Sequence, residues 1–547
     1  MARAILPEMG NPGLSMGGRL MRVLLIDTPY PFEEYPRPSL SLGYLGAVLE
    51  REDVDVQILD FLVAEYSSEK LRKKLEEYQP QVVGVTSSTL NYLTARQILR
   101  VCKGCDPDIV TVIGGPHVSF TAEDTLEQAP WIDIVVRGEG EETIIELIRA
   151  LETGGELGGV MGIAFRQDRR VVLTQPRPFI KDLDSLPFPA WHLVPLSKYL
   201  AIKAPVSVST SRGCPYGCIF CCGPLMMGHR VRLRSPKLVV DEIEKDHKEF
   251  GIKEFSFIDD TFTLNHRHAQ QICDEIRARN LDIELGSFSR ADHLTKELLV
   301  SMREAGFTGV LFGVESGSQK ILNTIKKNTT LDEIREGTKL ATENGIGVFA
   351  NFILGLPGET PETARESMDF GRELRDKYGA IYGFHLLSPF PGSELYEKAD
   401  EYSIKILSRD WADYDANRPI TETADMKAWQ AQEISDYYDR AAAYVWAEKR
   451  LLAESGDLQC RKELEEKDSR QFAWRLLKGD VIERVGRIKI TGAQNPAQGE
   501  QVEELAQRVS QRLAAPLDSA RHEIWKLAQK GLLRCEREGK GFVWKWG

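Results

Sequence analysis

Short apolar segments rich in β-branched residues alternate with segments of helical periodicity along most of this 547-residue chain. The first series begins at Arg22–Asp27 (RVLLID) and continues through Gln81–Thr86 (QVVGVT) and Ile109–Gly114 (IVTVIG). Strands separated by helices pair in parallel, because a parallel pair needs a long crossover connection. The pattern therefore predicts an α/β fold class whose first part is a Rossmann-like, doubly wound parallel sheet over residues 21–150.

A second alternating series begins near Val206. Its predicted strands are short, apolar and followed by helical segments, and they cover residues 206–210, 254–258, 283–287, 309–312, 347–354 and 381–387. Six β/α units are fewer than the eight of a closed barrel, so we predict a partial (β/α)6 barrel. Catalytic groups are expected at the carboxyl ends of its strands, where such barrels carry their functional loops.

The rest of the chain is arranged around these two sheets. The tail from about residue 480 has the order strand, helix, helix and hairpin, which resembles a winged helix in outline. The predicted organisation is an N-terminal extension (1–20), the Rossmann-like domain (21–150), a proline-rich linker (151–200), the partial barrel (201–400), a helical extension (401–470) and a winged-helix-like C-terminal module (471–547).

Charge and composition narrow the possible partners. The chain has 70 basic and 82 acidic residues and a net charge of −12, which argues against a general nucleic-acid binder. No segment reaches the about 20 apolar residues that a bilayer span needs. Residues 1–20 also lack the pattern of a signal peptide. We therefore expect a cytoplasmic protein with no membrane span.

Four of the nine cysteines lie within the segment Ser211–Cys222 (SRGCPYGCIFCC). Cys214, Cys218 and Cys221 have the spacing C-x3-C-x2-C and follow the first predicted barrel strand. Three thiolates on one short loop can hold three irons of a [4Fe–4S] cluster and leave the fourth iron open. A structural zinc site would need a second pair of ligands, and none with suitable spacing stands out. The spacing favours the cluster.

With an aromatic residue, Phe220, in its last gap, this segment resembles the motif of the radical S-adenosylmethionine (SAM) superfamily. Later segments resemble the same superfamily in order: FIDD at 257–260, SRAD at 289–292, GVESGS at 313–318 and FILGLPGE at 352–359. The resemblance implies a [4Fe–4S] cluster on Cys214, Cys218 and Cys221. It implies SAM contacts at Phe220, Asp259, Asp260, Ser289, Arg290, Glu315, Ser316, Ile353 and Leu354.

The first domain resembles a cobalamin-binding domain. The loop after its first strand (DTPYPFEEYPRPSLSLGYL, from Asp27) has no histidine, which is similar to radical SAM proteins whose cobalamin is base-off and has no protein histidine on cobalt. His117 is accordingly not expected to bind cobalt. The resemblance implies cobalamin contacts at strand ends with small residues, namely Thr86, Ser88, Leu90, Gly114, Gly115, Pro116, Gly138 and Glu139.

Two charged runs have an explanation in their local pattern. His229–Arg234 (HRVRLR) could contact an acidic substrate or a cofactor phosphate, but we favour a strand edge with solvated charges. Gly138–Glu142 (GEGEE) is expected to cap the helix that follows it.

The resemblance implies methylation of an unactivated substrate carbon through a 5′-deoxyadenosyl radical and methylcobalamin. The catalytic residues remain unassigned, because the cofactors supply the reactivity. A radical cyclase or oxidase acting on a porphyrin-like or lipid substrate is the alternative within the superfamily. A cobalamin-sensing regulator is the alternative of another class, but it leaves the cysteine motif unexplained. Expected partners are a small-molecule, lipid or peptide substrate and an external flavodoxin- or ferredoxin-like electron donor.

Overall fold

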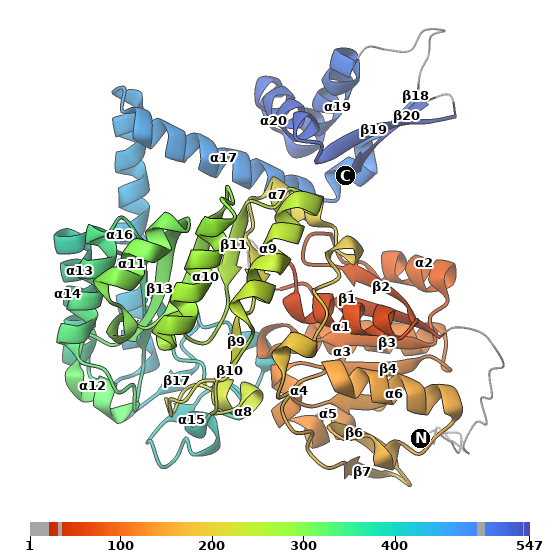
Figure 1. The fold of residues 1–547 in the computed structure, drawn as a ribbon, viewed down its shortest axis with the longest axis horizontal. Helices are drawn as coiled ribbons and strands as arrows, with labels where there is room; N and C mark the ends of the chain where they lie inside the picture. The colour runs from red at the N-terminus through yellow and green to blue at the C-terminus, as the bar shows by residue number, and fades with distance from the viewer. Residues whose placement is uncertain (1–20, 31–35, 490–497, 540) are drawn as a thin grey trace.

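The computed structural model describes residues 21–30, 36–489, 498–539 and 541–547. The predicted extension at residues 1–20 lies outside the described residues. Two parallel sheets dominate the fold, and a helical extension leads from the second sheet to a C-terminal module (Figure 1). The predicted α/β fold class is therefore confirmed.

The first sheet has the strand order β2-β1-β3-β4-β5-β6-β7, and β1 to β5 run parallel. Helices α1 and α6 cover one face, and α2, α3 and α5 cover the other, so alternate strand residues face two separate apolar cores. The parallel part consists of β1 Arg22–Asp27, α1 Leu40–Arg51, β2 Asp55–Asp60, α2 Ser68–Tyr78, β3 Val82–Thr86, α3 Tyr92–Cys105, β4 Val110–Gly114, α4 Pro116–Phe120, α5 Ala122–Gln128, β5 Ile134–Val136 and α6 Glu141–Thr153.

The first sheet extends beyond its predicted end at residue 150. Strands β6 (Ile163–Gln167) and β7 (Arg170–Leu173) form an antiparallel hairpin on the edge strand β5. The segment 151–200, for which the sequence predicts a linker, therefore contributes two strands to the sheet. A short hairpin next to a run of prolines carries little periodic signal of its own, because each strand has only four or five residues.

The remainder of this connecting segment is ordered against both sheets. Ala190 donates its backbone N–H to the carbonyl of Gly43 in α1 at 3.0 Å. Trp191, which is 1% exposed, donates its indole N–H to Asp246 in the second domain at 3.0 Å. Helix α7 (Leu196–Ala201) then leads into the second sheet.

The second sheet has six parallel strands in the order β15-β14-β13-β12-β11-β8, which is the predicted partial barrel. Helices between successive strands cover its outer face (Figure 1). Its elements are β8 Val206–Val208, α9 Pro236–Phe250, β11 Glu254–Phe257, α10 His266–Ala278, β12 Glu284–Ser289, α11 Lys296–Glu304, β13 Phe307–Glu315, α12 Gln319–Thr324, α13 Leu331–Glu343, β14 Gly347–Leu354, α14 Pro361–Tyr378 and β15 Ile381–Leu386.

Smaller elements lie at the carboxyl ends of the barrel strands and lead into the extension. They are β9 Ser211–Arg212, α8 Gly223–Met227, β10 Arg232–Leu233, α15 Glu394–Glu397, β16 Lys405–Ile406 and β17 Thr421–Glu422. Strands β9 and β10 pair antiparallel and form the base of the cysteine loop. The cysteine loop therefore connects the two strands of a short antiparallel ribbon at the mouth of the barrel.

Two long helices, α16 (Ala428–Glu454) and α17 (Leu458–Lys478), form the extension, and α17 reaches from the barrel towards the C-terminal module (Figure 1). The module has a three-stranded sheet in the order β18-β20-β19. Its elements are α18 Val481–Val485, β18 Arg487–Lys489, α19 Gln498–Leu513, α20 Leu517–Gln529, β19 Leu533–Glu538 and β20 Gly541–Trp546. None of the described helices combines the length and apolar character of a bilayer span.

Candidate functional site

A cavity of about 320 Å³ lies where the carboxyl ends of the first sheet meet the mouth of the barrel. From the first domain, its wall includes the predicted cobalamin residues Thr86, Gly114, Gly115, Pro116, Gly138 and Glu139. From the barrel, it includes Ser209, Ser211, Arg212, Met226, Met227, Ile258 and Asp260. Ser88 and Leu90, which carry the same prediction, lie outside that wall. Both domains therefore contribute to one cavity at the edges where ligands of such sheets bind.

Small residues give this cavity its depth. It extends between the sheet and helices α1 and α6, where Gly84 and Gly114 form part of the wall. None of the described wall residues is a histidine. His117 is buried elsewhere, with its Nδ1 3.1 Å from the Thr89 hydroxyl and its ring between Tyr92 and Trp411. The residues present fit a cofactor with an extended tail and no histidine ligand.

Gly115 allows two neighbouring strand ends to approach each other. Its φ is +109°, and a Cβ atom at this position would lie 2.2 Å from the backbone oxygen of Ser87. Ser87 follows β3 and donates its backbone N–H to the carbonyl of Gly114 at 2.8 Å. Only glycine can adopt this conformation in so little space.

The cysteine loop begins and ends at the β9–β10 ribbon. Gly213 has a φ of +105°, and a Cβ there would meet the carbonyl oxygens of Arg230 and Gly228 at 2.7 and 2.8 Å. Cys214 donates its backbone N–H to that Gly228 carbonyl at 3.1 Å. At the other end of the motif, Gly223 donates its N–H to the Cys221 sulfur at 3.3 Å. These contacts fix the backbone at the first cysteine of the motif and the sulfur of the last.

The three motif thiols come from one short loop, as three ligands of a single cluster must, and they are protonated when no metal is bound. Burial raises the pKa of Cys214 and Cys218, and it raises the pKa of Cys221 to about 12. A metal must therefore displace the protons when it binds. Among the residues that the structure describes, no three His, Cys, Asp or Glu side chains converge on one point. A [4Fe–4S] cluster does not require such convergence, because each thiolate binds a different iron. The residues fit this group.

Arg290, one of the predicted SAM contacts, lies against the cysteine loop. Its guanidinium stacks on the ring of Tyr216 with Cζ 3.9 Å from the centroid. It donates to both oxygens of Asp292 at 3.0 and 2.8 Å and to the carbonyl of Asn328 at 3.0 Å. Its positive charge partly offsets the burial that raises the pKa of Cys214. Arg290 thus places a fixed cation beside the thiols.

Glu315 forms a buried ion pair that the sequence did not reveal. Lys327 donates to its Oε1 at 2.8 Å, and Glu315 itself has a left-handed φ of +68° at the end of β13. The Lys327 charge also lowers the pKa of Cys218 against the effect of burial. The neighbouring Lys326 is exposed and pairs with Glu394. Two adjacent lysines carry no local signal that separates the buried one from the exposed one.

The two aspartates after β11 lie in different environments. Asp259 accepts hydrogen bonds from the backbone N–H groups of Thr210 and Ser211 at 2.7 and 2.9 Å and from the Thr210 hydroxyl. Asp260 lines the cavity and lies beside Gly223. Asp259 therefore ties β11 to the start of the cysteine loop, and Asp260 is the carboxylate that faces the cavity.

The other predicted SAM residues are at or near the barrel strands' carboxyl ends. The Ser289 hydroxyl lies 3.2 Å from the Ser287 hydroxyl. The Ser316 hydroxyl lies 3.2 Å from the Ser367 hydroxyl and accepts the backbone N–H of Ser318 at 3.1 Å. Phe220 and Ile353 are partly buried against the barrel core, and Leu354 is fully buried. Ser316 thus has a structural role in its turn.

The fully buried Glu359 predicts a pH dependence of stability. Its carboxylate accepts the backbone N–H of Gly355, and burial raises its pKa from 4.5 to about 8. Between these values the folded chain holds a proton that the unfolded chain releases, so stability falls as pH rises. We expect Glu359→Gln to flatten the fall of the unfolding midpoint between pH 5 and 8, measured by denaturant titration. An unchanged slope would contradict this assignment.

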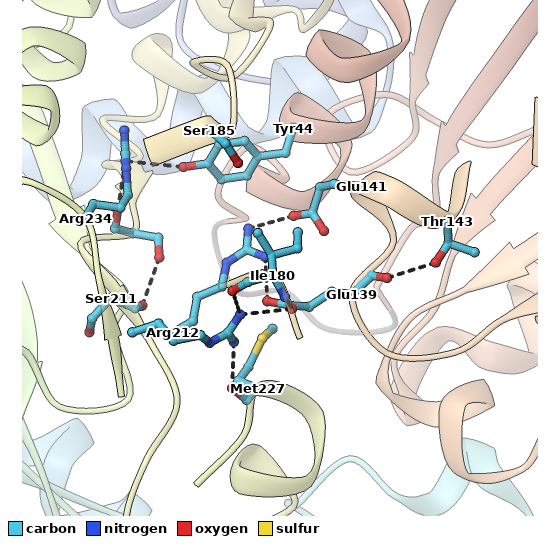
Figure 2. Close-up of polar contacts among 12 residues, drawn as sticks. Tyr44, Glu139, Glu141, Thr143, Ile180, Ser185, Ser211, Arg212, Met227 and Arg234 are labelled. Carbon is cyan, nitrogen blue, oxygen red and sulfur yellow. Dashed lines mark hydrogen bonds and ion pairs between the residues drawn. The ribbon is translucent and has the colours of Figure 1, made fainter. Parts of the chain in front are cut away.

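The expectation of solvated charges is wrong for Arg232 and Arg234, and the expectation of a helix cap is wrong for Glu139. Arg232 and Arg234 are largely or fully buried and pair with Glu139 and Glu242 at 3.0 and 2.7 Å, so they are not solvated charges. Helix α6 begins after Gly140 without a side-chain cap, and Glu139 turns towards the barrel instead (Figure 2). Glu139 and Arg232 are partners from different domains, and Glu242, the partner of Arg234, lies on the next helix α9, so neither pairing is visible in the short run itself.

Comparisons with known proteins agree with this geometry. Residues 34–148 match the B12 binding domain, and residues 208–371 match the Radical SAM superfamily. An uncharacterized methyltransferase of Pyrococcus horikoshii, PH0819, is 35% identical over 76% of this chain and 89% of its own length. An anaerobic magnesium-protoporphyrin IX monomethyl ester cyclase of Rubrivivax gelatinosus is 32% identical over 70% of this chain and 69% of its own length.

Solved structures share the fold. The cobalamin-dependent SAM radical enzyme OxsB, with aqua-cobalamin and SAM bound, matches 94% of this chain and 79% of its own with a TM-score of 0.66 and 20% identity. The radical SAM methyltransferase TsrM from Kitasatospora setae matches 76% of this chain and 88% of its own with a TM-score of 0.62 and 22% identity. With a cysteine loop and a B12-type sheet that share one cavity, this chain belongs to the radical SAM superfamily, among the members that carry a B12-binding domain.

Proposed function

We propose that this protein is a cobalamin-dependent radical SAM enzyme that methylates an unactivated carbon of its substrate. The single observation that carries the proposal is the shared cavity. Arg212 and Asp260, which adjoin the cysteine loop, line the same cavity as Gly114 and Gly115 of the first domain. A group held at each site would therefore face the other across a short distance, as a transfer between them requires.

When bound, the cluster and SAM supply a 5′-deoxyadenosyl radical, and cobalamin supplies the methyl group. The protein residues supply placement. Cys214, Cys218 and Cys221 would hold the cluster, and Arg290 and Lys327 supply positive charge beside the thiols. Each SAM cleavage consumes one electron, which we assign to a flavodoxin- or ferredoxin-like donor in the cytoplasm.

The methyl group can be followed through the reaction with SAM that carries a deuterated methyl. After anaerobic reconstitution with iron, sulfide and cobalamin, we expect 5′-deoxyadenosine, label on the retained cobalamin and a product heavier by one labelled methyl group. The reconstituted enzyme is incubated with mixtures of candidate substrates, and mass spectrometry of the reaction mixture measures all three. SAM cleavage without retained cobalamin would contradict the methyl-transfer role.

A cyclase reaction is the second candidate, because the Rubrivivax gelatinosus relative carries that name at 32% identity. A cyclase product would lose hydrogens and carry no deuterium from SAM. The same labelled experiment therefore separates the two reactions by the mass of the product.

A further inference from the structure

A buried ion-pair network joins the first domain to the base of the cysteine loop (Figure 2). Glu139 follows Gly138 in the loop between β5 and α6. Its Oε1 accepts from Arg212 at 2.8 Å, and its Oε2 accepts from Arg232 at 3.0 Å. Arg212 donates through its other terminal nitrogen to Glu141 at 2.6 Å. The Glu139 side chain is 3% exposed and each of the two arginines is 10% exposed, so solvent screens these charges little.

The two arginines stand at the two ends of the cysteine loop. Arg212 on β9 and Arg232 on β10 are direct partners in the antiparallel ribbon. Arg212 lies two residues before Cys214. Arg232 donates to the carbonyl of Met227 at 2.7 Å, next to Gly228, whose carbonyl holds the Cys214 N–H. One carboxylate of the first domain therefore holds both the entry and the exit of the loop.

The Glu139 carboxylate is committed mainly to protein partners in this arrangement, because three hydrogen bonds occupy most of its about four acceptor sites. Besides the two arginines, it accepts the backbone N–H of Ile180 at 2.8 Å. Arg232 in turn donates to the carbonyl of Ile180, which lies in the segment that connects the two domains. A buried ion pair of this kind contributes little net stability compared with apolar packing, but losing one partner leaves an uncompensated buried charge. Its geometric effect is to fix the relative position of three chain segments.

We propose that Glu139 is a positioning residue that sets the cysteine loop against the cavity wall of the first domain, and so fixes the separation of the two cofactor sites. The inference rests on the proposed function, because two bound cofactors give that separation its meaning. It assigns to Glu139 a role through Arg212 and Arg232, in place of the direct cobalamin contact that the sequence predicts.

The test separates chemistry that needs only the cysteine loop from chemistry that needs both sites. Glu139→Gln keeps the shape of the side chain and removes its charge. We expect it to retain iron and to form 5′-deoxyadenosine within about threefold of wild type. Transfer of the deuterated SAM methyl to cobalamin, with titanium(III) citrate as reductant, should fall at least about tenfold, because small misplacements of reacting groups cost this much or more. Glu139→Asp, which restores the charge, should recover part of the loss.

Glu142→Gln is the matched control. It removes the same charge three residues later, but Glu142 is 53% exposed and pairs with Arg177 at 3.6 Å, away from the cysteine loop's two arginines. It should behave as wild type. A Glu139→Gln enzyme with the wild-type ratio of methyl transfer to 5′-deoxyadenosine would overturn the inference. So would a variant that loses iron, cleavage and methyl transfer in parallel, because that pattern is simple loss of structure.

Hydrogen exchange gives a readout that does not depend on cobalamin. In the cluster-reconstituted protein, Glu139→Gln should raise the exchange of residues 213–231 at least about tenfold and leave β12 unchanged, since only the loop loses its anchor. Unchanged exchange in that segment would overturn the positioning role. If wild type retains no cobalamin while the exchange result holds, the proposed function fails and the anchoring of the loop by Glu139 stands.

Discussion

Cys214→Ala is expected to remove nearly all of the about four irons that a [4Fe–4S] cluster brings to each chain. Reductive cleavage of SAM should fall with it to the background of the assay, because two thiolates do not hold the cluster with one open iron. Iron and sulfide analysis after anaerobic reconstitution, together with quantification of 5′-deoxyadenosine, measures both effects. The folded protein should persist, since Cys214 is only partly buried and lies in a loop.

Cys222→Ala is the control for this experiment. Cys222 is adjacent to Cys221 and is also partly buried, but it lies outside the C-x3-C-x2-C spacing. It should keep the wild-type iron content and SAM cleavage. Equal iron in wild type and Cys214→Ala would refute the cluster assignment. Loss of iron in Cys222→Ala would identify Cys222, instead of Cys221, as the third ligand.

Gly115→Ala should lower the free energy of unfolding by about 3 kcal/mol or more and abolish cobalamin retention. The φ of +109° is accessible to almost no residue but glycine, and the added Cβ would lie 2.2 Å from the Ser87 oxygen. That contact involves two backbone segments, so no side-chain rotation relieves it. The strand ends would have to separate at the wall of the cavity. Denaturant unfolding and cobalamin content after desalting test the two parts.

Gly138→Ala separates the effect of a positive φ from the effect of a close contact with the added Cβ. Gly138 lines the same cavity with a φ of +74°, but a Cβ there would meet no atom within 4 Å. A left-handed alanine costs about 1–2 kcal/mol, so this variant should be only mildly destabilised. Equal losses in the two variants would show that the close approach at Gly115 has little effect.

The sequence predicts most of this fold because a parallel strand that is buried on both faces is a continuous apolar run. Runs such as Arg22–Asp27 are apolar on both faces, and the six barrel strands follow the predicted order. The hairpin β6–β7 was missed because its strands are short and partly exposed. The cysteine motif was visible because all three thiols come from one loop. The assignments of individual SAM and cobalamin contacts remain predictions.

The ion-pair network could not be predicted in the same way. Glu139 lies 73 residues before Arg212 and 93 residues before Arg232. Local periodicity reports which face of an element is buried, but the choice of charge partner depends on how the two domains dock. Arg212 and Arg232 are direct partners only because β9 and β10 form a ribbon. An alternating basic run and an acidic loop end each have a simpler local explanation, and both explanations were wrong here.

The ordered connection between the two domains has a consequence for turnover. Ala190 and Trp191 bind it to α1 and to Asp246, and Ile180 joins it to the network around Glu139. Domains on a flexible tether search for each other at an effective concentration that the tether length sets. Here the conformational entropy of bringing the two halves together is lost once, when the chain folds. Each catalytic cycle then begins with both cofactor sites already side by side, and only substrate and SAM have to be captured from solution.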